Sequence, residues 1–314
     1  MKHSWSIEAR DLIALEREAR ALGIRPGRPV STALAGSHAS RFKSRGADYL
    51  ESRPYQPGDD VRQLDWRVTA RTGKVHTKLF TEERERPVLM LVDLSPSMYF
   101  GSRRVLKAEL AAEAAALLGW AAIHGGDRVG AVLAVEPDHH EMAPAGGRRG
   151  VMNLIQALVR GVPEAAQTLQ RPAGLGNALG RLQRLARPGA LTVIISDFYE
   201  FDEDAQRRLR ALRRHQDVRA LWITDPLEDV PPPPGRYAVT DGKRRAWLDA
   251  RSNRVREHYH AGWEAHVEQL KSCMDSAQIP LTRLSTEEPA ARTLARAIGG
   301  KRRGVPGFKS AAGY

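Results

Sequence analysis

The chain has 314 residues, enough for one large domain with a smaller one or for two modest domains. A hydrophobic fraction of 42% suffices for a packed core and argues against global disorder. The single cysteine, Cys273, excludes an internal disulfide framework and cysteine-rich zinc sites. A net charge of +12 and a pI near 10.2 favour an acidic protein, nucleic acid or an anionic membrane surface as the binding partner, without choosing among them.

The beginning of the chain lacks the features of a targeting segment. Residues 1–21 carry several acidic side chains among their apolar ones, so they hold no signal-peptide core. The longest weakly polar run, residues 114–123, is too short to cross a bilayer. We therefore expect a cytoplasmic protein without a membrane span. A first helix is predicted at residues 7–22, where apolar residues recur at helical spacing.

Residues 53–73 combine turn chemistry with alternating charged and aromatic residues. Residues 57–60, Pro-Gly-Asp-Asp, have turn composition, because proline fixes φ, glycine permits positive φ and aspartate caps nearby backbone. A strand is predicted at residues 75–83. The expected members of buried or half-buried ion pairs in this segment are Arg62, Asp65, Arg67 and Arg71. The candidates for a partner-binding or interdomain surface are Asp59, Asp60, Arg62, Asp65 and Trp66.

Residues 88–98 begin as a continuous apolar run, as in a strand that is buried on both faces of a parallel sheet. The run ends in Asp93, Ser95 and Ser97, spaced Asp-x-Ser-x-Ser. The carboxyl end of a central strand in an open α/β sheet is where ligands collect, and carboxylate and hydroxyl oxygens suit Mg²⁺ or Mn²⁺. This spacing resembles the metal-ion-dependent adhesion site of von Willebrand factor A domains, in which the serines bind the metal and the aspartate acts mostly through water. The alternative is a serine-rich turn that only caps a helix.

The order of motifs from Arg53 to Met98 is more specific than the metal motif alone. Arg-x-Tyr-x-Pro-Gly-Asp-Asp is followed by Arg-x-Leu-Asp-Trp, then by Ala-Arg, and then by a strand that ends Asp-x-Ser-x-Ser-Met. On these residues the chain resembles domain-of-unknown-function family 58. The resemblance implies a von Willebrand factor A-like domain, no established catalytic activity, and a gene that often lies beside that of a MoxR-type AAA+ ATPase.

Downstream, helical and strand patterns alternate, which predicts an α/β fold with a doubly wound, mainly parallel sheet and helices on both faces. Helices are expected at residues 102–124, with Ser102 as the cap, and at residues 151–159, 178–186, 204–215, 254–277 and 289–298. Strands are expected at residues 127–135, 191–197, 218–223 and 281–284, with a short edge strand at 139–143. The predicted parts are an N-terminal helix and accessory segment at 1–85, the von Willebrand factor A-like domain at 86–299, and a basic flexible tail at 300–314.

Another apolar strand ends at Asp197, which the resemblance makes the fourth contributor to the Asp93 site, through water. The family pattern also has a threonine before the helix at residues 178–186, and Ala173 stands where that threonine is expected. Because one direct oxygen ligand is thereby lost, two interpretations stay open: a weakened Mg²⁺ or Mn²⁺ site, or a structural remnant of one. We expect no catalytic residues, and the candidate metal ligands are Asp93, Ser95, Ser97 and Asp197.

The favoured function is a non-enzymatic interaction adaptor, since a bound ion with an open coordination position can accept a carboxylate of an acidic protein partner. The resemblance implies that the partner is a MoxR-type AAA+ ATPase and the role chaperone-like, in protein maturation or remodelling. A hydrolase is disfavoured, because no Gly-x-x-x-x-Gly-Lys loop occurs and Ser95 stands where a dehalogenase-like phosphatase has its second acid. The alternative is a nucleic-acid or anionic-surface binder that uses the arginines of residues 207–214 and the basic tail.

Overall fold

The structure is a computed structural model of the chain. It describes residues 7–22, 47–57, 59–82, 86–135, 139–161, 174–240 and 245–299. The chain divides into two compact units, one formed by residues 1–26 with 86–314 and the other by residues 27–85. The division predicted from the sequence differs from this in one respect, since the N-terminal helix belongs to the larger unit and not to the accessory segment. The predicted tail at 300–314 lies outside the described residues.

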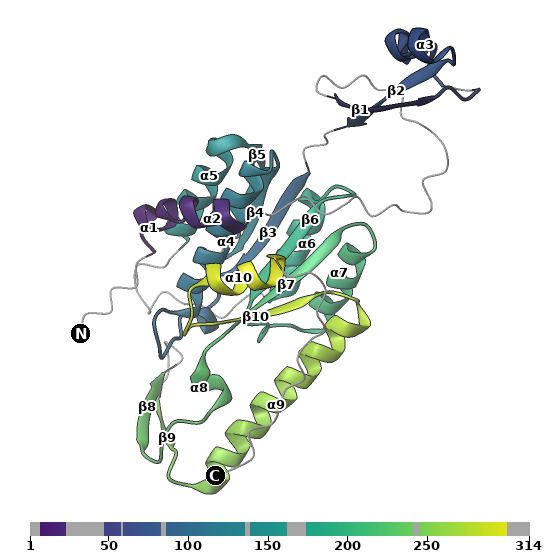
Figure 1. Cartoon of the computed structure of the whole chain (residues 1–314). Coiled ribbons are helices and arrows are strands. Elements are labelled where there is room, and N and C mark those ends of the chain that lie inside the picture. The colour runs from purple at the N-terminus through teal and green to yellow at the C-terminus, as the bar shows by residue number, and fades with distance from the viewer. Residues whose placement is uncertain are drawn as a thin grey trace. The chain divides into compact units, whose positions relative to one another are not determined.

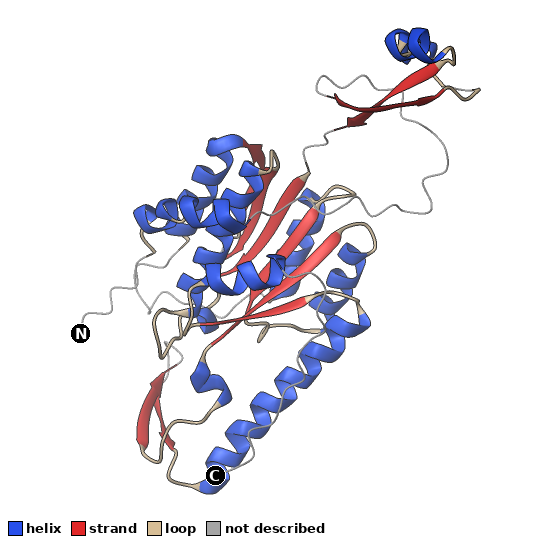
Figure 2. Cartoon of the chain, viewed as in Figure 1, coloured by secondary structure: helices blue, strands red, loops and turns tan. Residues whose placement is uncertain are grey.

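The larger unit is built on a six-stranded sheet in the order β10-β7-β6-β3-β4-β5 (Figures 1 and 2). All neighbouring strands pair parallel except β4 and β5, which pair antiparallel. The strands are β3 (Pro87–Asp93), β4 (Arg128–Ala134), β5 (His140–Gly146), β6 (Leu191–Ser196), β7 (Asp217–Thr224) and β10 (Leu281–Ser285). Because β3 comes first in this sheet and later strands are added on both sides of it, the sheet is doubly wound. The predicted α/β class is confirmed.

Helices cover both faces of this sheet, and the side chains of β3 alternate between the two faces. Val88, Met90 and Val92 belong to the core formed with α1 (Ala9–Ala14), α2 (Glu16–Leu22), α4 (Lys107–His124), α5 (Gly147–Arg160) and α10 (Ala290–Gly299). Leu89 and Leu91 belong to the core formed with α6 (Leu175–Leu185), α7 (Glu203–Arg213) and α9 (Asn253–Ser276). This double burial explains the continuous apolar run from which the strand was predicted.

The helix α4 begins at Lys107, five residues later than the sequence predicts. Leu106 is its N-cap residue, and the Glu109 side chain accepts a hydrogen bond from Leu106 N at 2.9 Å. The predicted cap, Ser102, does not reach the helix, because its backbone N–H and its hydroxyl both donate to Asp225. The rest of α4 is rich in alanine and buried almost all round, which lets it pack closely between the sheet and the helices α2, α5 and α10.

In the larger unit, one α-helix and two strands were not predicted. They are the short helix α8 (Pro226–Asp229) and the antiparallel pair β8 (Arg236–Thr240) and β9 (Arg245–Asp249). Most residues of β8 and β9 are exposed, so these strands carry no apolar alternation by which a strand can be recognised. Among the described residues, no helix combines the length and apolar character needed to cross a membrane.

In the smaller unit, β1 (Ala47–Pro54) and β2 (His76–Glu82) pair antiparallel, and the 3-10 helix η1 (Val61–Gln63) and the helix α3 (Trp66–Thr72) lie between them in the chain. Asp65 caps α3, since its Oδ1 accepts hydrogen bonds from Arg67 N and Val68 N, both at 3.1 Å. Its Oδ2 accepts a hydrogen bond from Ser52 Oγ at 2.7 Å. The Asp65 carboxylate therefore fixes the start of its own helix and also holds it to β1.

The ion pairs predicted for this segment are wrong. The acid–base pair that forms joins Arg53 to Asp59, at 2.7 Å. Arg62, Arg67 and Arg71 make no ion pair with any residue that the structure describes in this unit. The prediction failed because Asp65 binds backbone N–H groups, which outcompete a flexible, solvated arginine for the same oxygens.

Candidate functional site

Polar side chains follow four neighbouring parallel strands at the carboxyl edge of the sheet. Asp93 ends β3, Asp197 follows β6, Asp225 follows β7 and Thr286 follows β10. All four side chains are buried. In an open α/β sheet this edge is where ligands bind, so the topology gathers residues from distant parts of the chain at a place suited to a site.

Asp93 is held by two hydrogen bonds at this edge. Ser95 N donates to its Oδ1 at 2.9 Å, and Ser196 Oγ donates to its Oδ2 at 2.6 Å. Burial, reinforced by the charge of Asp197, raises the pKa of Asp93 to about 6. Since a charge buried without a partner is costly, the buried Asp93 carboxylate favours a cation nearby.

The hydroxyls of Ser95 and Ser97 lie beside Asp93, with their Oγ atoms 3.2 Å apart. Two adjacent oxygen ligands of an octahedral Mg²⁺ ion lie about 2.9 Å apart when the bonds are about 2.0–2.1 Å long. The spacing of the serine pair is therefore compatible with two metal ligands, and the metal site of Asp93, Ser95 and Ser97 stays a prediction. The position of the expected threonine, Ala173, lies outside the described residues.

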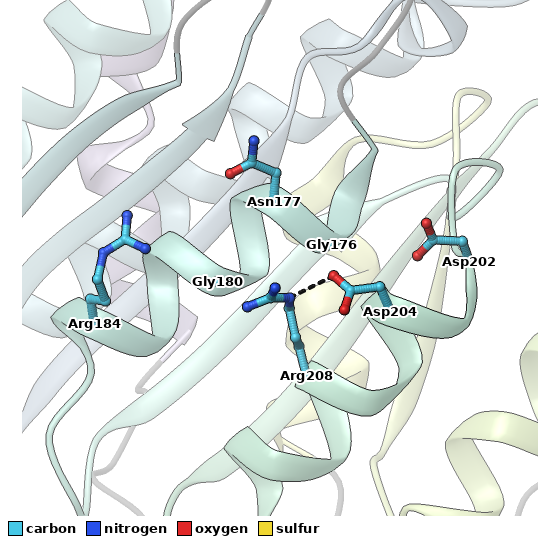
Figure 3. A pocket seen from close by; sticks show the side chains of 7 residues that line it. All are labelled: Gly176, Asn177, Gly180, Arg184, Asp202, Asp204 and Arg208. Atoms are coloured by element: carbon cyan, nitrogen blue, oxygen red, sulfur yellow. Dashed lines mark hydrogen bonds and ion pairs between the residues drawn. The ribbon is translucent and has the colours of Figure 1, made fainter.

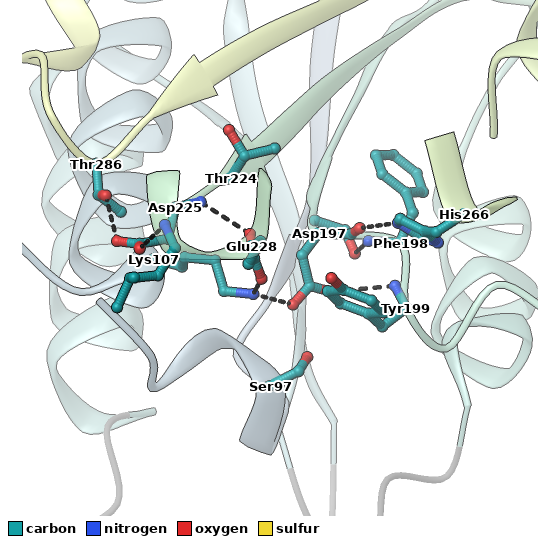
Figure 4. A network of polar contacts seen from close by, with 12 residues as sticks. Ser97, Lys107, Asp197, Phe198, Tyr199, Thr224, Asp225, Glu228, His266 and Thr286 are labelled. Carbon is teal, nitrogen blue, oxygen red and sulfur yellow. Dashed lines mark hydrogen bonds and ion pairs between the residues drawn. The ribbon is translucent and has the colours of Figure 1, made fainter. Parts of the chain in front are cut away.

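Asp197 lies at the same edge, but its carboxylate is already engaged. Lys107 Nζ lies 2.7 Å from Asp197 Oδ2 and 2.5 Å from Glu228 Oε1, and all three side chains are less than a tenth exposed (Figure 4). Burial disfavours the charged ammonium, but the charges of Asp197 and Glu228 outweigh this effect and raise the pKa of Lys107. The first residue of α4 thus brings a positive charge to the predicted metal site.

Two aromatic side chains flank this ammonium at the surface. Lys107 Nζ lies 5.1 Å from the ring centroid of Tyr199 and 6.0 Å from that of Phe100. The two residues are 45% and 41% exposed. Tyr199 also stacks on His266, with 4.4 Å between ring centroids, and burial lowers the pKa of His266, so this imidazole is neutral at pH 7. The site therefore has exposed aromatic rings around a desolvated polar centre, the composition of anchor points in protein interfaces.

Asp225, the next carboxylate along the edge, ties three segments together. Its Oδ2 accepts hydrogen bonds from Ser102 N at 2.7 Å and from Thr286 Oγ1 at 2.6 Å. Its Oδ1 accepts hydrogen bonds from Ser102 Oγ at 2.5 Å and from Leu227 N at 2.9 Å. Burial favours the protonated acid, but these hydrogen bonds outweigh it and lower the pKa of Asp225. Asp225 therefore holds the loop before α4 against the ends of β7 and β10.

Sequence reasoning identified Asp93, Ser95, Ser97 and Asp197, and the structure places all four at the carboxyl edge of the sheet. It missed Lys107, Asp225 and Glu228. Asp225, like Asp197, is a carboxylate that directly follows an apolar strand. The pattern that predicted Asp197 as a site residue could therefore have predicted Asp225 as well. Lys107 and Glu228 carry no such signal, because a lysine at the start of a helix and a glutamate in a short turn are ordinarily exposed.

Apart from this site, a polar cavity of about 240 Å³ is lined by residues of α6 and α7 (Figure 3). Its central ion pair joins Asp204 Oδ2 to Arg208 Nε at 2.6 Å. Gly176 and Gly180 leave room for this pair, since a Cβ atom there would lie 2.7 Å from Asp204 Oδ2 and 2.6 Å from an Arg208 nitrogen. Gly176 and Gly180 therefore allow α6 to pack closely against α7.

Comparison with known proteins gives the family. Residues 51–269 match the family described as "Protein of unknown function DUF58". The chain is 30% identical over 280 residues to the "Uncharacterized protein Rv1480" of Mycobacterium tuberculosis, a match that covers 87% of this chain and 85% of the relative. Among solved structures it is similar to BatB from Bacteroides thetaiotaomicron, with a TM-score of 0.43, 14% identity, and 68% of this chain and 97% of the other covered. It is also similar to a von Willebrand factor type A structure from Catenulispora acidiphila, with a TM-score of 0.40, 14% identity, and 71% and 44% covered. By its motifs and by this match, the chain belongs to the DUF58 family.

Proposed function

We propose that this chain is a non-enzymatic protein-interaction adaptor that binds its partner at the carboxyl edge of the six-stranded sheet. The observation that carries the proposal is the convergence of Asp93, Ser95 and Ser97, whose serine Oγ atoms lie 3.2 Å apart. These residues would hold a Mg²⁺ or Mn²⁺ ion, which would supply a coordination position for a carboxylate of an acidic partner. The net charge of +12 favours encounter with such a partner.

The proposed partner is a MoxR-type AAA+ ATPase, on the resemblance that the motifs carry. A protein contact needs apolar anchors as well as a polar centre, and Phe100 and Tyr199 supply them beside the Asp93 site. We place the adaptor in protein maturation or remodelling, where the ATPase supplies the energy and this chain supplies the contact.

The arginines of α7 favour this function over nucleic-acid binding. Arg207 and Arg208 pair with an aspartate one turn earlier, and Arg213 donates to two backbone oxygens. Arg210 and Arg214 stay exposed. Because most of these side chains already have partners in the fold, the helix presents less free positive charge to phosphates than its sequence indicates.

The smaller unit offers a second contact surface, on α3. Trp66 is 69% exposed, and Arg67, Ala70 and Arg71 are exposed with it. Positions i, i+1, i+4 and i+5 lie on one side of a helix, so these four residues form one continuous face. A large aromatic ring next to two arginines suits an acidic protein segment, by apolar contact and by charge.

The five residues predicted as a partner-binding or interdomain surface divide into two groups. Asp59, Asp60 and Asp65 accept hydrogen bonds from nearby backbone N–H groups and so fix the turns of the unit itself. Arg62 and Trp66 are exposed. We propose both for partner contact, Trp66 as part of the α3 face and Arg62 in addition to it.

The experiment is a pull-down of a MoxR-type AAA+ ATPase from the same organism by the full chain, with Mg²⁺ or with EDTA. Capture should depend on Mg²⁺, and Asp93→Ala should abolish the magnesium-dependent part, because the serines lose the carboxylate that supports the ion. Asp249→Ala, which removes a half-exposed carboxylate that pairs with Arg251 at the end of β9, is the matched control and should bind like the wild type. If the Asp93→Ala variant still captured the ATPase in a magnesium-dependent way, this result would contradict the proposed site.

The same pull-down tests the α3 face. Trp66→Ala should weaken capture about tenfold with or without Mg²⁺, since the loss of a central aromatic anchor typically costs 1–2 kcal/mol or more. Val75→Ala removes another exposed apolar side chain of the same unit and should have little effect. Equal effects of the two substitutions would show that Trp66 is an ordinary surface residue.

A further inference from the structure

We infer that Lys107 acts as an internal counter-ion of the Asp93 site and lowers its affinity for divalent cations. This role of Lys107 rests on the proposed function, since it concerns the same cation site. The residue belongs to none of the motifs that predicted the site, yet its ammonium lies 2.7 Å from Asp197, one of the four candidate metal ligands.

The position of the ammonium is fixed by its surroundings. Lys107 is 1% exposed, and its Nζ donates to Asp197 Oδ2 and Glu228 Oε1 (Figure 4). The rings of Tyr199 and Phe100 lie over it at 5.1 and 6.0 Å. A lysine enclosed in this way cannot swing into solvent without breaking both charged hydrogen bonds, so its charge stays at the site.

The ammonium opposes a divalent ion in two ways. A divalent ion held near Asp197 would be repelled by the ammonium that lies 2.7 Å from that carboxylate, because like charges repel more strongly in a buried setting than in water. Lys107 also neutralises Asp197, which leaves less negative charge to attract the ion. Asp93 differs from Asp197 in this respect, because the hydrogen bonds that the structure describes for its carboxylate come from neutral groups, the backbone and side chain of Ser95 and the hydroxyl of Ser196.

The alternative is that Lys107 only anchors the start of α4 through buried ion pairs. Anchoring predicts that loss of the ammonium changes stability but not metal affinity. Counter-ion action predicts that loss of the ammonium makes the site bind metal more tightly. Metal affinity, measured in proteins that remain folded, therefore separates the two roles.

The test compares two variants of the full chain that differ only in the ammonium. Glu228→Gln retains Lys107, and the double variant Lys107→Met with Glu228→Gln removes the ammonium without leaving Glu228 as a second uncompensated carboxylate. Calorimetric titration of the metal-stripped proteins with Mg²⁺ and with Mn²⁺ should give a dissociation constant at least about tenfold lower for the double variant than for Glu228→Gln.

Arg104→Met is the matched control, since it removes a cation that pairs with Glu113 at 2.8 Å near the start of the same helix. It should leave the dissociation constant unchanged. Lys107→Gln in the Glu228→Gln background is a second variant, polar and close in length, for the case that methionine prevents folding. Thermal unfolding of each protein verifies that the measured samples are folded.

The outcomes separate this role from the proposed function. Tighter binding by the variants without the ammonium supports the inference, even if the wild type binds no metal. Metal binding by the wild type, without any gain in those variants, overturns the role of Lys107 and leaves the proposed function standing. Absence of binding in every protein overturns both.

Discussion

Replacing Lys107 by methionine should lower the free energy of unfolding by about 3–5 kcal/mol, because the Asp197 and Glu228 carboxylates then stay buried without a counter-ion. Methionine is close to lysine in length and fills the same space with apolar atoms, so a cavity contributes little to the loss. Urea denaturation of the full chain at pH 7, followed by circular dichroism, measures the difference.

A second substitution isolates the electrostatic cause. Glu228→Gln added to Lys107→Met should recover part of the lost free energy, since only one carboxylate is then left without its counter-ion. Arg104→Met removes an ion pair that is partly open to solvent and should cost about 1 kcal/mol or less. A cost for Lys107→Met that is no larger than for Arg104→Met would show that the buried ion pairs do not hold α4 in place.

Asp225→Asn should lower the free energy of unfolding by about 2–3 kcal/mol, the second largest effect that we expect. The carboxylate accepts four hydrogen bonds, from Ser102 N, Ser102 Oγ, Thr286 Oγ1 and Leu227 N. An asparagine of the same shape keeps one acceptor oxygen, so donors on the other side lose their partner. The same urea titration measures the loss.

This effect of Asp225→Asn should depend on pH in a defined direction. The pKa of Asp225 is lowered in the folded protein, since hydrogen bonds from Ser102 and Thr286 outweigh the opposing effect of burial. A carboxyl group with a lowered folded pKa contributes stability above its unfolded pKa, near 4, and loses this contribution as the pH falls through the folded pKa. The difference between wild type and variant should therefore be constant above about pH 5 and shrink below about pH 4. A difference that grows on acidification would contradict the assigned hydrogen bonds.

The sheet was predictable because its central strands are buried on both faces. The largely apolar strands β3 and β6 contain six and five consecutive buried residues, a pattern typical of central strands in a chain with alternating helices. The strands β8 and β9 were not predicted because most of their residues are exposed and their sequences lack the apolar pattern of a buried strand. The start of α4 was misplaced because Ser102 has the chemistry of a cap but forms its hydrogen bonds with Asp225, 123 residues away.

The site was predictable only where its residues are close in sequence. Asp93, Ser95 and Ser97 stand in one motif, whereas Lys107 meets Asp197 across 90 residues and Glu228 across 121. The burial of Lys107 between Asp197 and Glu228 depends on how α4 packs against the ends of the strands. This packing cannot be predicted from the spacing of residues in the sequence. The place of the N-terminal helix was missed for the same reason, since it depends on contacts such as the hydrogen bond from Trp120 Nε1 to Leu12 O at 3.1 Å.

The measurement that tests the central claim most directly is calorimetric titration of Mg²⁺ and Mn²⁺ into the metal-stripped full chain, with Asp93→Ala alongside. We expect the wild type to bind one ion per chain and the variant to bind none while it keeps its thermal unfolding transition. Equal binding by both proteins would place the ion elsewhere, and absence of binding by the wild type would contradict a metal-dependent contact at this edge of the sheet.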